Sequence, residues 1–219
     1  MTAYAYLHGF GSSPAARKAV ELRAAFAAIG LELQTPNLAV PSFAKLTLTA
    51  GLEIIEGLGQ AARARGEKLA LIGSSMGGFL AATHAARRPD DVEGLVLLCP
   101  GFDMPARFRT LVGERGLRRW KKHDRIAYPD ADNVVIAIHY GLFSDVESFD
   151  PFPAPPSNGV LTTIVHGVHD AVVPVEISRA YVAAHPSVRL VEADDDHRLH
   201  GSIPLVLGVV SEAFGVALR

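Results

Sequence analysis

The stretch LALIGSSMGGFLAA, Leu69–Ala82, joins an apolar run to an alanine-rich helical pattern through two serines flanked by glycines. Residues 73–77 fit the spacing G-x-S-x-G, with Ser75 at the centre. A strand that leads at once into a helix places the central serine on a tight turn, and the glycines let neighbouring backbone pass closely. The helix N-terminus adds unpaired N–H groups and a positive dipole end. The pattern favours Ser75 as a nucleophile over the alternative that Ser74 or Ser75 only caps the helix.

The rest of the chain alternates between short apolar runs and helical patterns. Strands are expected at residues 2–7, 31–36, 68–73, 94–100, 160–167 and 188–193, with helices between them and a last helix at 202–217. Apolar strands separated by helices predict an α/β fold with a mostly parallel sheet of about six strands and helices on both faces. A length of 219 residues fits one domain, expected to span residues 1–219.

Composition argues against several classes of function. The formal net charge of −2 predicts no general attraction to nucleic acid or to an anionic membrane. Cys99 is the only cysteine, so neither an intrachain disulfide nor a cysteine-rich metal site is expected. The start of the chain, MTAYAYLHGFGSS, lacks the pattern of a signal peptide, and no apolar stretch reaches 18 residues. We therefore expect a cytoplasmic protein.

Residues 102–159 interrupt the alternation and are expected to form a lid or cap insertion, because so long a connection in a small domain usually serves binding. A strand at NVVIAIHY is expected to pair with residues 118–127, as a hairpin across Pro129–Asn133. Four aromatic side chains of the insertion are expected to line an acyl pocket or to pack the lid down: Phe102, Phe108, Trp120 and Phe143.

The insertion opens with a basic stretch. Its cations are Arg107, Arg109, Arg115, Arg118, Arg119, Lys121, Lys122 and Arg125, and only Asp103, Glu114 and Asp124 oppose them. Such a stretch is able to attract an anionic group, for example the nucleotide part of an acyl-CoA. The interpretation that we favour is a solvated surface.

A second motif, YLHGFGSSP, follows the first expected strand. A serine that attacks a carbonyl needs two N–H donors for the oxyanion. The N–H of Met76, next to the nucleophile, is one candidate, and the N–H of Phe10 in this loop is the other, with Gly11 after it. In the alternative, Gly9 and Gly11 only shape the turn. His8 is expected to brace the loop.

The segment IVHGVHDAVVP supplies an acid at the end of the strand at 160–167. Reactive groups gather at the carboxyl ends of strands in open α/β sheets, which favours Asp170 as the group that orients a catalytic histidine. Asp103, just past the strand at 94–100, is the alternative acid. His166 and His169 are expected to be packing or loop residues.

The segment VEADDDHRLHGS follows the last expected strand and holds two candidate bases. His197 lies in the loop and is preferred, whereas His200 adjoins the last helix. The three neighbouring aspartates, residues 194–196, favour a protonated imidazole. We expect at least two of them to form a solvated turn.

Together these segments resemble the α/β-hydrolase superfamily, and LHGFGSSP, GSSMGG, HGVHDAVVP and DDDHRL are similar to its small bacterial esterase and thioesterase branch. Ser75, Asp170 and His197 stand in the order Ser–Asp–His typical of that superfamily. The resemblance implies hydrolysis of a small acyl ester or thioester, through an acyl-enzyme, without a metal or organic cofactor. Acyl transfer, peptide, lactone or C–C bond cleavage, and a non-catalytic binding role, remain the alternatives.

Overall fold

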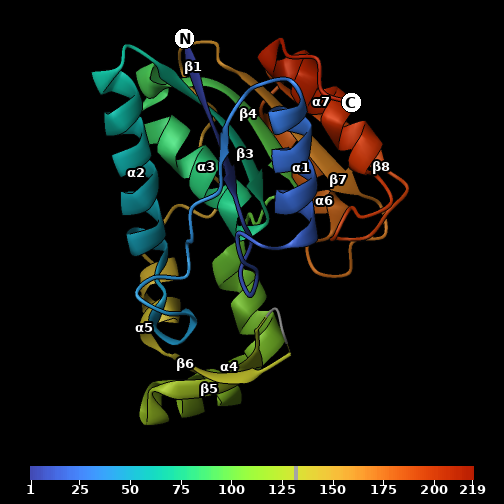
Figure 1. Cartoon of the computed structure of the whole chain (residues 1–219). Helices are drawn as coiled ribbons and strands as arrows, with labels where there is room; N and C mark the ends of the chain where they lie inside the picture. The colour runs from blue at the N-terminus through green and yellow to red at the C-terminus, as the bar shows by residue number, and fades with distance from the viewer. Residues whose placement is uncertain (131–132) are drawn as a thin grey trace.

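The computed structural model describes residues 1–130 and 133–219. At its centre lies a six-stranded sheet in the order β2–β1–β3–β4–β7–β8, in which every neighbouring pair is parallel (Figure 1). The strands of this sheet are β1 (Thr2–Leu7), β2 (Leu33–Gln34), β3 (Lys68–Ser74), β4 (Val92–Leu98), β7 (Leu161–Gly167) and β8 (Val188–Ala193). The predicted parallel sheet of six strands is therefore confirmed.

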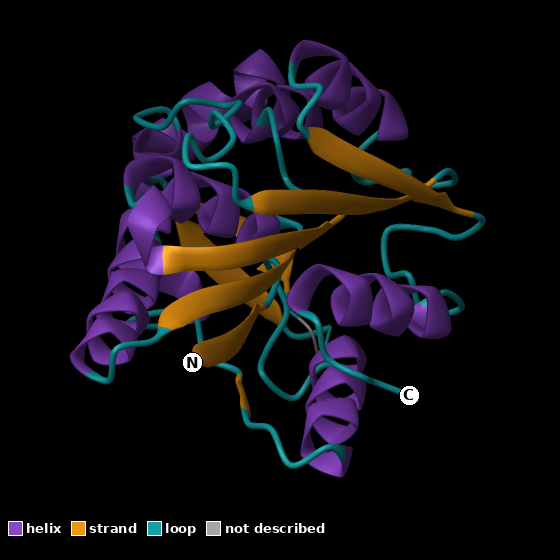
Figure 2. Ribbon diagram, turned by 90° about the horizontal axis from the view of Figure 1, so that it is seen from above, coloured by secondary structure: helices purple, strands orange, loops and turns teal. Residues whose placement is uncertain are grey.

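Helices cover both faces of the sheet (Figure 2). The helices that flank the sheet are α1 (Arg17–Ala28), α2 (Leu48–Ala64), α3 (Met76–Arg87), α6 (Val175–Ala184) and α7 (Ile203–Phe214), and two short 3₁₀ turns are η1 (Phe43–Lys45) and η2 (Pro89–Asp91). Apolar side chains of α1 and α7 belong to one buried cluster, and those of α2, α3 and α6 belong to the other. In the described part of the chain, no helix is both long and apolar enough to span a membrane.

Strand side chains alternate between these two clusters. Leu71 of β3 and Leu97 of β4 face the α2–α3 side, whereas Ile72 and Val96 face the α1–α7 side. Successive residues of a strand point to opposite faces, so a strand covered by helices on both sides must be apolar throughout. This is the physical reason for the continuous apolar runs in the sequence.

Residues 102–159, which the sequence predicts to be an insertion, form four elements between β4 and β7 in their described part. They are α4 (Met104–His123), β5 (Arg125–Pro129), β6 (Val135–His139) and α5 (Gly141–Val146). In Figure 1, α4, β5 and β6 lie beyond the ends of the strands of the main sheet, on the side where β1 ends. At Gly113 the backbone leaves helical geometry (φ 68°, ψ 160°), so α4 consists of two helical segments.

The expected hairpin in the insertion is only partly correct. β6 is a strand and pairs antiparallel with β5 over residues 125–129, but residues 118–123 belong to α4 and not to a strand. Leu117 and Trp120 are three residues apart and both buried, which a helix satisfies and a strand does not. The turn predicted across Pro129–Asn133 includes residues 131–132, which lie outside the described residues.

Candidate active site

Ser75 lies on the turn between β3 and α3 in a backbone conformation that non-glycine residues rarely adopt (φ 52°, ψ −116°). Its backbone holds the turn in place, because its N–H donates to the carbonyl of Leu98 at 2.9 Å and its carbonyl accepts from the N–H of Gly101 at 2.9 Å. The Ser75 side chain forms no capping hydrogen bond to α3. Its hydroxyl is therefore not used as a helix cap, and the strain of the turn is of the kind found at functional sites.

The glycines on either side of Ser75 are required by close backbone approach. A Cβ on Gly77 would lie 2.1 Å from the carbonyl oxygen of Leu7, and a Cβ on Gly73 would lie 2.4 Å from the carbonyl oxygen of Gly77. Neither position has room for a side chain. The G-x-S-x-G spacing thus reflects the packing of α3 against the ends of β1 and β3.

The HG loop, residues 8–14, passes beside Ser75. A Cβ placed on Gly9 would lie 3.8 Å from Ser75 Oγ. Gly11 has φ 67°, the left-handed conformation that favours glycine. Met76 is the first residue of α3, so its N–H has no partner within the helix. The roles of Phe10 and Met76 as oxyanion donors remain predictions.

His8 braces the HG loop, as expected from the sequence. It is buried, its Nδ1 lies 2.9 Å from the carbonyl oxygen of Gly9, and its Nε2 accepts a hydrogen bond from the N–H of Leu38 at 2.9 Å. Burial lowers the pKa of His8. A neutral imidazole with its proton on Nδ1 satisfies both contacts.

Asp170 and His197 come together at the carboxyl ends of β7 and β8. His197 Nδ1 lies 2.6 Å from Asp170 Oδ2, and the other carboxylate oxygen accepts from the N–H groups of Val172 and Val173, each at 2.7 Å. The Asp170 side chain is fully buried, whereas that of His197 is one-fifth exposed. Both atoms of the carboxylate are therefore occupied, and one of them orients His197.

Burial raises the pKa of the Asp170 carboxyl, but hydrogen bonds from His166 and His197 and from the N–H of Val173 outweigh it. The result is a pKa below the ordinary value of an aspartate. His166 contributes through its Nε2, 3.2 Å from Asp170 Oδ2, and is fixed by Ser178 Oγ and the carbonyl of Val173, each at 2.8 Å. The sequence predicted His166 only as a packing or loop residue, without this contact to Asp170.

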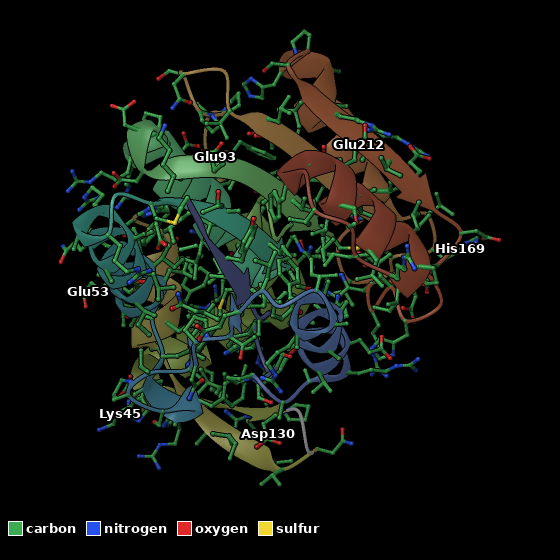
Figure 3. The ribbon with its side chains drawn as sticks, turned by 45° about the horizontal axis from the view of Figure 1, so that its top comes forward. Lys45, Glu53, Glu93, Asp130, His169 and Glu212 are labelled. Carbon is green, nitrogen blue, oxygen red and sulfur yellow. The ribbon has the colours of Figure 1, made fainter. Side chains whose placement is uncertain are left out.

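The alternative acid and base lie elsewhere. The backbone N–H of Asp103 bonds to the carbonyl of Pro151, and in the described chain no hydrogen bond joins its side chain to His197. His200 is partly buried, which lowers its pKa, and no hydrogen bond in the described residues joins it to Asp170. His169 points outward at the edge of the molecule, where it pairs with Asp194 at 2.8 Å (Figure 3). Of the preferred and alternative acids and bases, only Asp170 and His197 are hydrogen-bonded to each other in the described residues.

Ser75 and His197 are not joined by a hydrogen bond between their side chains in residues 1–130 and 133–219. Catalytic hydrogen bonds are often long in the absence of substrate and shorten when it binds. The structure thus brings the acid and the base into contact and places Ser75 at the end of β3, on the same edge of the sheet.

The three aspartates before His197 differ in environment. Asp194 is exposed, whereas Asp195 uses its carboxylate to accept from the backbone N–H of Asp196 at 2.8 Å and of Gly201 at 2.9 Å. Asp196 accepts from the N–H of Arg198 at 2.7 Å. The turn is solvated in part, and Asp195 and Asp196 also fix the backbone of the loop that carries His197.

Behind the nucleophile, Lys18 of α1 is buried and donates to Ser74 Oγ at 2.8 Å. Burial lowers the pKa of Lys18, and the carboxylates of Asp170, Asp195 and Asp196 counteract this. No local sequence pattern predicts this contact, because a lysine on an amphipathic helix is normally exposed. Ser74 is therefore more than a spacer: it satisfies a buried cation beneath the turn.

A cavity of about 580 Å³ lies between the HG loop and the insertion. Its walls include Phe10 from the loop, Phe108 and Trp120 from α4, and Tyr128 from β5. Of the four aromatic residues named from the sequence, Phe108 and Trp120 line this cavity, whereas the other two only pack. Phe143 lies 6.0 Å from Trp120, and Phe102 stacks 4.4 Å from Tyr181, both measured between ring centroids.

Most cations of the basic stretch are exposed, as we expected for a solvated surface. Arg109 pairs with Glu147, and Arg118 lies 3.9 Å from Glu114. Arg119 and Arg125 reach the rim of the cavity. Arg107 is the exception, because part of its guanidinium group is buried.

The described residues contain one cluster with the ligand types of a metal site, formed by Cys99, His166 and Asp170. All three are buried, and Asp170 and His166 are already hydrogen-bonded to protein atoms. Burial raises the pKa of the Cys99 thiol to about 12, which disfavours the thiolate that a metal ion requires. The donor set fits a packed hydrogen-bond cluster better than a metal centre.

Comparison with solved structures places this geometry among known folds. Est1E from Butyrivibrio proteoclasticus, solved with ferulic acid, is similar with a TM-score of 0.82 and 21% identity over 98% of this chain and 88% of that one. Mouse alpha/beta hydrolase domain-containing protein 10 is similar with a TM-score of 0.79 and 19% identity, over 97% of this chain and 89% of that one. A pyrethroid hydrolase from Sphingobium faniae JZ-2 is similar with a TM-score of 0.67 and 16% identity, over 98% of this chain and 100% of that one. The chain therefore has the α/β-hydrolase fold that its motifs predict.

Comparison of sequences identifies the family of the chain. No curated protein sequence matches the chain. A family model described as an uncharacterised protein family, UPF0227, matches residues 3–207, which include Ser75, Asp170 and His197. Because this match covers most of the chain, the protein belongs to the UPF0227 family, and it has an α/β-hydrolase fold.

Proposed function

We propose that the protein is a serine hydrolase that cleaves small carboxylic esters or thioesters through a Ser75–His197–Asp170 triad. The observation that carries this proposal is the 2.6 Å contact between His197 Nδ1 and the buried Asp170 carboxylate, on the same sheet edge as the strained Ser75 turn. A strained serine and an oriented histidine are the parts that nucleophilic acyl transfer requires.

The proposed reaction begins at His197. With its Nδ1 proton directed to Asp170, the free Nε2 accepts the proton of Ser75 as Oγ attacks the carbonyl carbon of the substrate. The oxyanion is held by the N–H groups of Met76 and Phe10, with Gly9 and Gly11 giving the loop its shape. His197 then protonates the leaving alcohol or thiol, and a water molecule, activated by the same base, releases the acid from Ser75.

The substrate is proposed to be a small acyl ester or thioester. Two similar structures are named as Est1E with bound ferulic acid and as a pyrethroid hydrolase. The cavity beside Phe10 is lined mainly by apolar and aromatic side chains, which suits an acyl or aryl group. In this proposal residues 102–159 act as the lid that closes over that group. An acyl-CoA is one such thioester.

A fluorophosphonate probe tests the proposed chemistry, because it labels activated serines. We expect labelling at Ser75, identified by peptide mapping, and its loss in Ser75→Ala. Ser187→Ala changes an exposed serine, and this control should still be labelled. Hydrolysis of 4-nitrophenyl butyrate by Ser75→Ala should fall by about 10⁴-fold or more. Unchanged turnover in Ser75→Ala, or no labelling of the wild type, would refute the proposal.

A panel of matched substrates separates the chemistries that share this fold. A carboxylic ester, a thioester, a lactone and a peptide of the same acyl group are compared by kcat/KM. The proposal expects the ester or thioester to be cleaved fastest. A faster lactone or peptide reaction would keep the triad but replace the substrate class.

A further inference from the structure

Arg107 has a buried guanidinium nitrogen without a partner. Its Nη1 atom is shielded from solvent and forms no hydrogen bond. No ion pair within residues 1–130 and 133–219 includes Arg107, whereas Arg109 on the same helix pairs with Glu147. An unpaired N–H of a charged group removed from water costs free energy, and native proteins rarely leave one without a reason.

Arg107 lies on the face of α4 that is turned toward the Ser75 turn. Residues three apart on a helix share a face, so Arg107 lies on the same side as Met104. A Cβ on Gly101 would lie 3.2 Å from Met104 Cε and 3.3 Å from the backbone nitrogen of Met76. The first turn of α4 is thus next to the N–H proposed to hold the oxyanion.

Phe108, the residue after Arg107, packs near Phe10, whose N–H is the other proposed oxyanion donor. The ring of Phe108 lies 6.0 Å from that of Phe10, and the ring of Tyr128, from β5, lies 5.0 Å from Phe10. Tyr128 is also among the groups that act electrostatically on Arg107. Arg107 is therefore close enough to β5 to be influenced by Tyr128, and the residue that follows it in α4 packs against the HG loop.

Among the described residues, the carboxylates of Asp170 and Asp103 act electrostatically on Arg107, and neither forms an ion pair with it. Burial lowers the pKa of Arg107, and Asp170, Asp103 and Tyr128 counteract this, Asp170 most strongly. The Asp170 carboxylate is already occupied by His197 and by backbone N–H groups. The positive charge of Arg107 is therefore close to the proposed catalytic residues, and its Nη1 remains free to donate a hydrogen bond to an anion.

We infer that Arg107 is an anion-binding, specificity-determining residue that selects esters or thioesters carrying a carboxylate close to the bond that is cleaved. This inference rests on the proposed function and adds to it the charge of the substrate. A guanidinium presents a planar fork of N–H donors that matches a carboxylate, and such charged hydrogen bonds are stronger than neutral ones. Binding of the carboxylate satisfies the N–H that folding leaves unpaired.

Two pairs of substrates test the inference, one for each side of the scissile bond. On the acyl side, mono-4-nitrophenyl glutarate is compared with its neutral methyl ester. On the alcohol side, 4-acetoxybenzoate is compared with methyl 4-acetoxybenzoate. The wild type should prefer the charged member of at least one pair by roughly tenfold in kcat/KM, the size expected for one charged hydrogen bond. Because the site is partly buried, the preference should persist at 0.5 M salt.

Three variants assign the preference to Arg107. Arg107→Gln should reduce the charged-to-neutral ratio to about one, mainly through KM, and Arg107→Lys should retain part of it, because the charge remains but the fork does not. Arg115→Gln removes an exposed cation of the same helix and should keep the wild-type ratio. Equal ratios in Arg107→Gln and the wild type, or no preference in either pair, would overturn the inference.

A binding measurement keeps this test separate from the proposed hydrolysis. Monomethyl glutarate is titrated calorimetrically into Ser75→Ala and into Ser75→Ala with Arg107→Gln. Roughly tenfold weaker binding in the double variant supports the inference even if the esters are cleaved slowly, and equal binding contradicts it. Turnover that depends on Ser75 without any charge preference would remove this inference and leave the proposed function intact. Absence of probe labelling would instead remove the proposed function.

Discussion

Asp170 carries a buried charge and Arg107 a partly buried one, and their surroundings differ. Asp170 follows β7 of the central sheet, and both of its oxygens are hydrogen-bonded. Arg107 lies in the first turn of α4, in the insertion, and its Nη1 has no partner. One charge is satisfied by the protein and the other is not.

The difference separates Asp170, which the protein holds in place, from Arg107, which we propose binds an anion. Hydrogen bonds on every side hold the Asp170 carboxylate in one position and in its charged form, as the orientation of a catalytic base requires. Arg107 lacks such bonds. In our proposal, hydrogen bonds to a bound anion offset the desolvation cost of its buried N–H. The sheet edge thus supplies the proposed chemistry, and the insertion supplies the proposed selectivity.

The largest expected effect comes from removing the charge of Asp170 while keeping its shape. In Asp170→Asn the amide oxygen still accepts from Val172 and Val173, but the amide nitrogen donates to His197 Nδ1. That reverses the tautomer, so Nε2 carries the proton and is unable to take one from Ser75. The value of kcat for a neutral 4-nitrophenyl ester should fall by about 10³–10⁴-fold. Asp103→Asn is the control and should retain turnover within a few-fold; equal losses in both variants would contradict the assignment.

A smaller effect is expected on stability, and it depends on pH. The pKa of Asp170 in the folded protein is lowered, so its contribution is fully present above the ordinary aspartate pKa of about 3.9 and is lost as the pH falls toward the folded value. Wild type should exceed Asp170→Asn in unfolding free energy by about 1.5–3 kcal/mol at pH 6. Urea unfolding at pH 6 and pH 3 measures this gap, which should narrow at pH 3. A gap that is independent of pH would show that the charge of Asp170 is not what stabilises the fold.

The smallest effect has the opposite sign and concerns Arg107. Arg107→Met keeps the aliphatic volume and removes a cation that has no partner, so thermal or urea unfolding should show a gain of up to about 1 kcal/mol. Arg63→Met is the matched control. Arg63 pairs with the largely buried Asp91, so its loss leaves a carboxylate unpaired and should destabilise the protein. Destabilisation by Arg107→Met as large as that by Arg63→Met would mean that Arg107 is a structural residue.

The fold was predictable from the sequence because its signals are local. The strands of the main sheet are covered on both faces, which forces apolar runs such as KLALIG, and the helices between them carry their own periodicity. The first strand of the predicted hairpin was placed too early in the chain. Residues 118–123 carry mainly basic side chains, and their helical structure is indicated only by the burial of Leu117 and Trp120. A short amphipathic pattern of this kind allows either structure until its packing partners are known.

The candidate site was predictable only in part. The Ser75 turn has a local signature, since the glycines on both sides are required by backbone contacts. Lys18 and Ser74 are hydrogen-bonded although they lie far apart in the chain. His166, which contacts Asp170, belongs to a strand whose sequence predicts only a core residue. Nothing in a single sequence distinguishes a buried lysine on a helix from an exposed one.

The sequence alone determined the order of strands and helices, the position of Ser75 and the presence of an acid and a histidine after later strands. These features depend on the spacing of neighbouring residues. Tertiary structure alone decided that His197 is hydrogen-bonded to Asp170 and not to Asp103, and that the Nη1 atom of Arg107 is buried without a partner among the described residues. Both depend on the register of parallel strands and the path of long loops, which bring together groups that no local pattern connects.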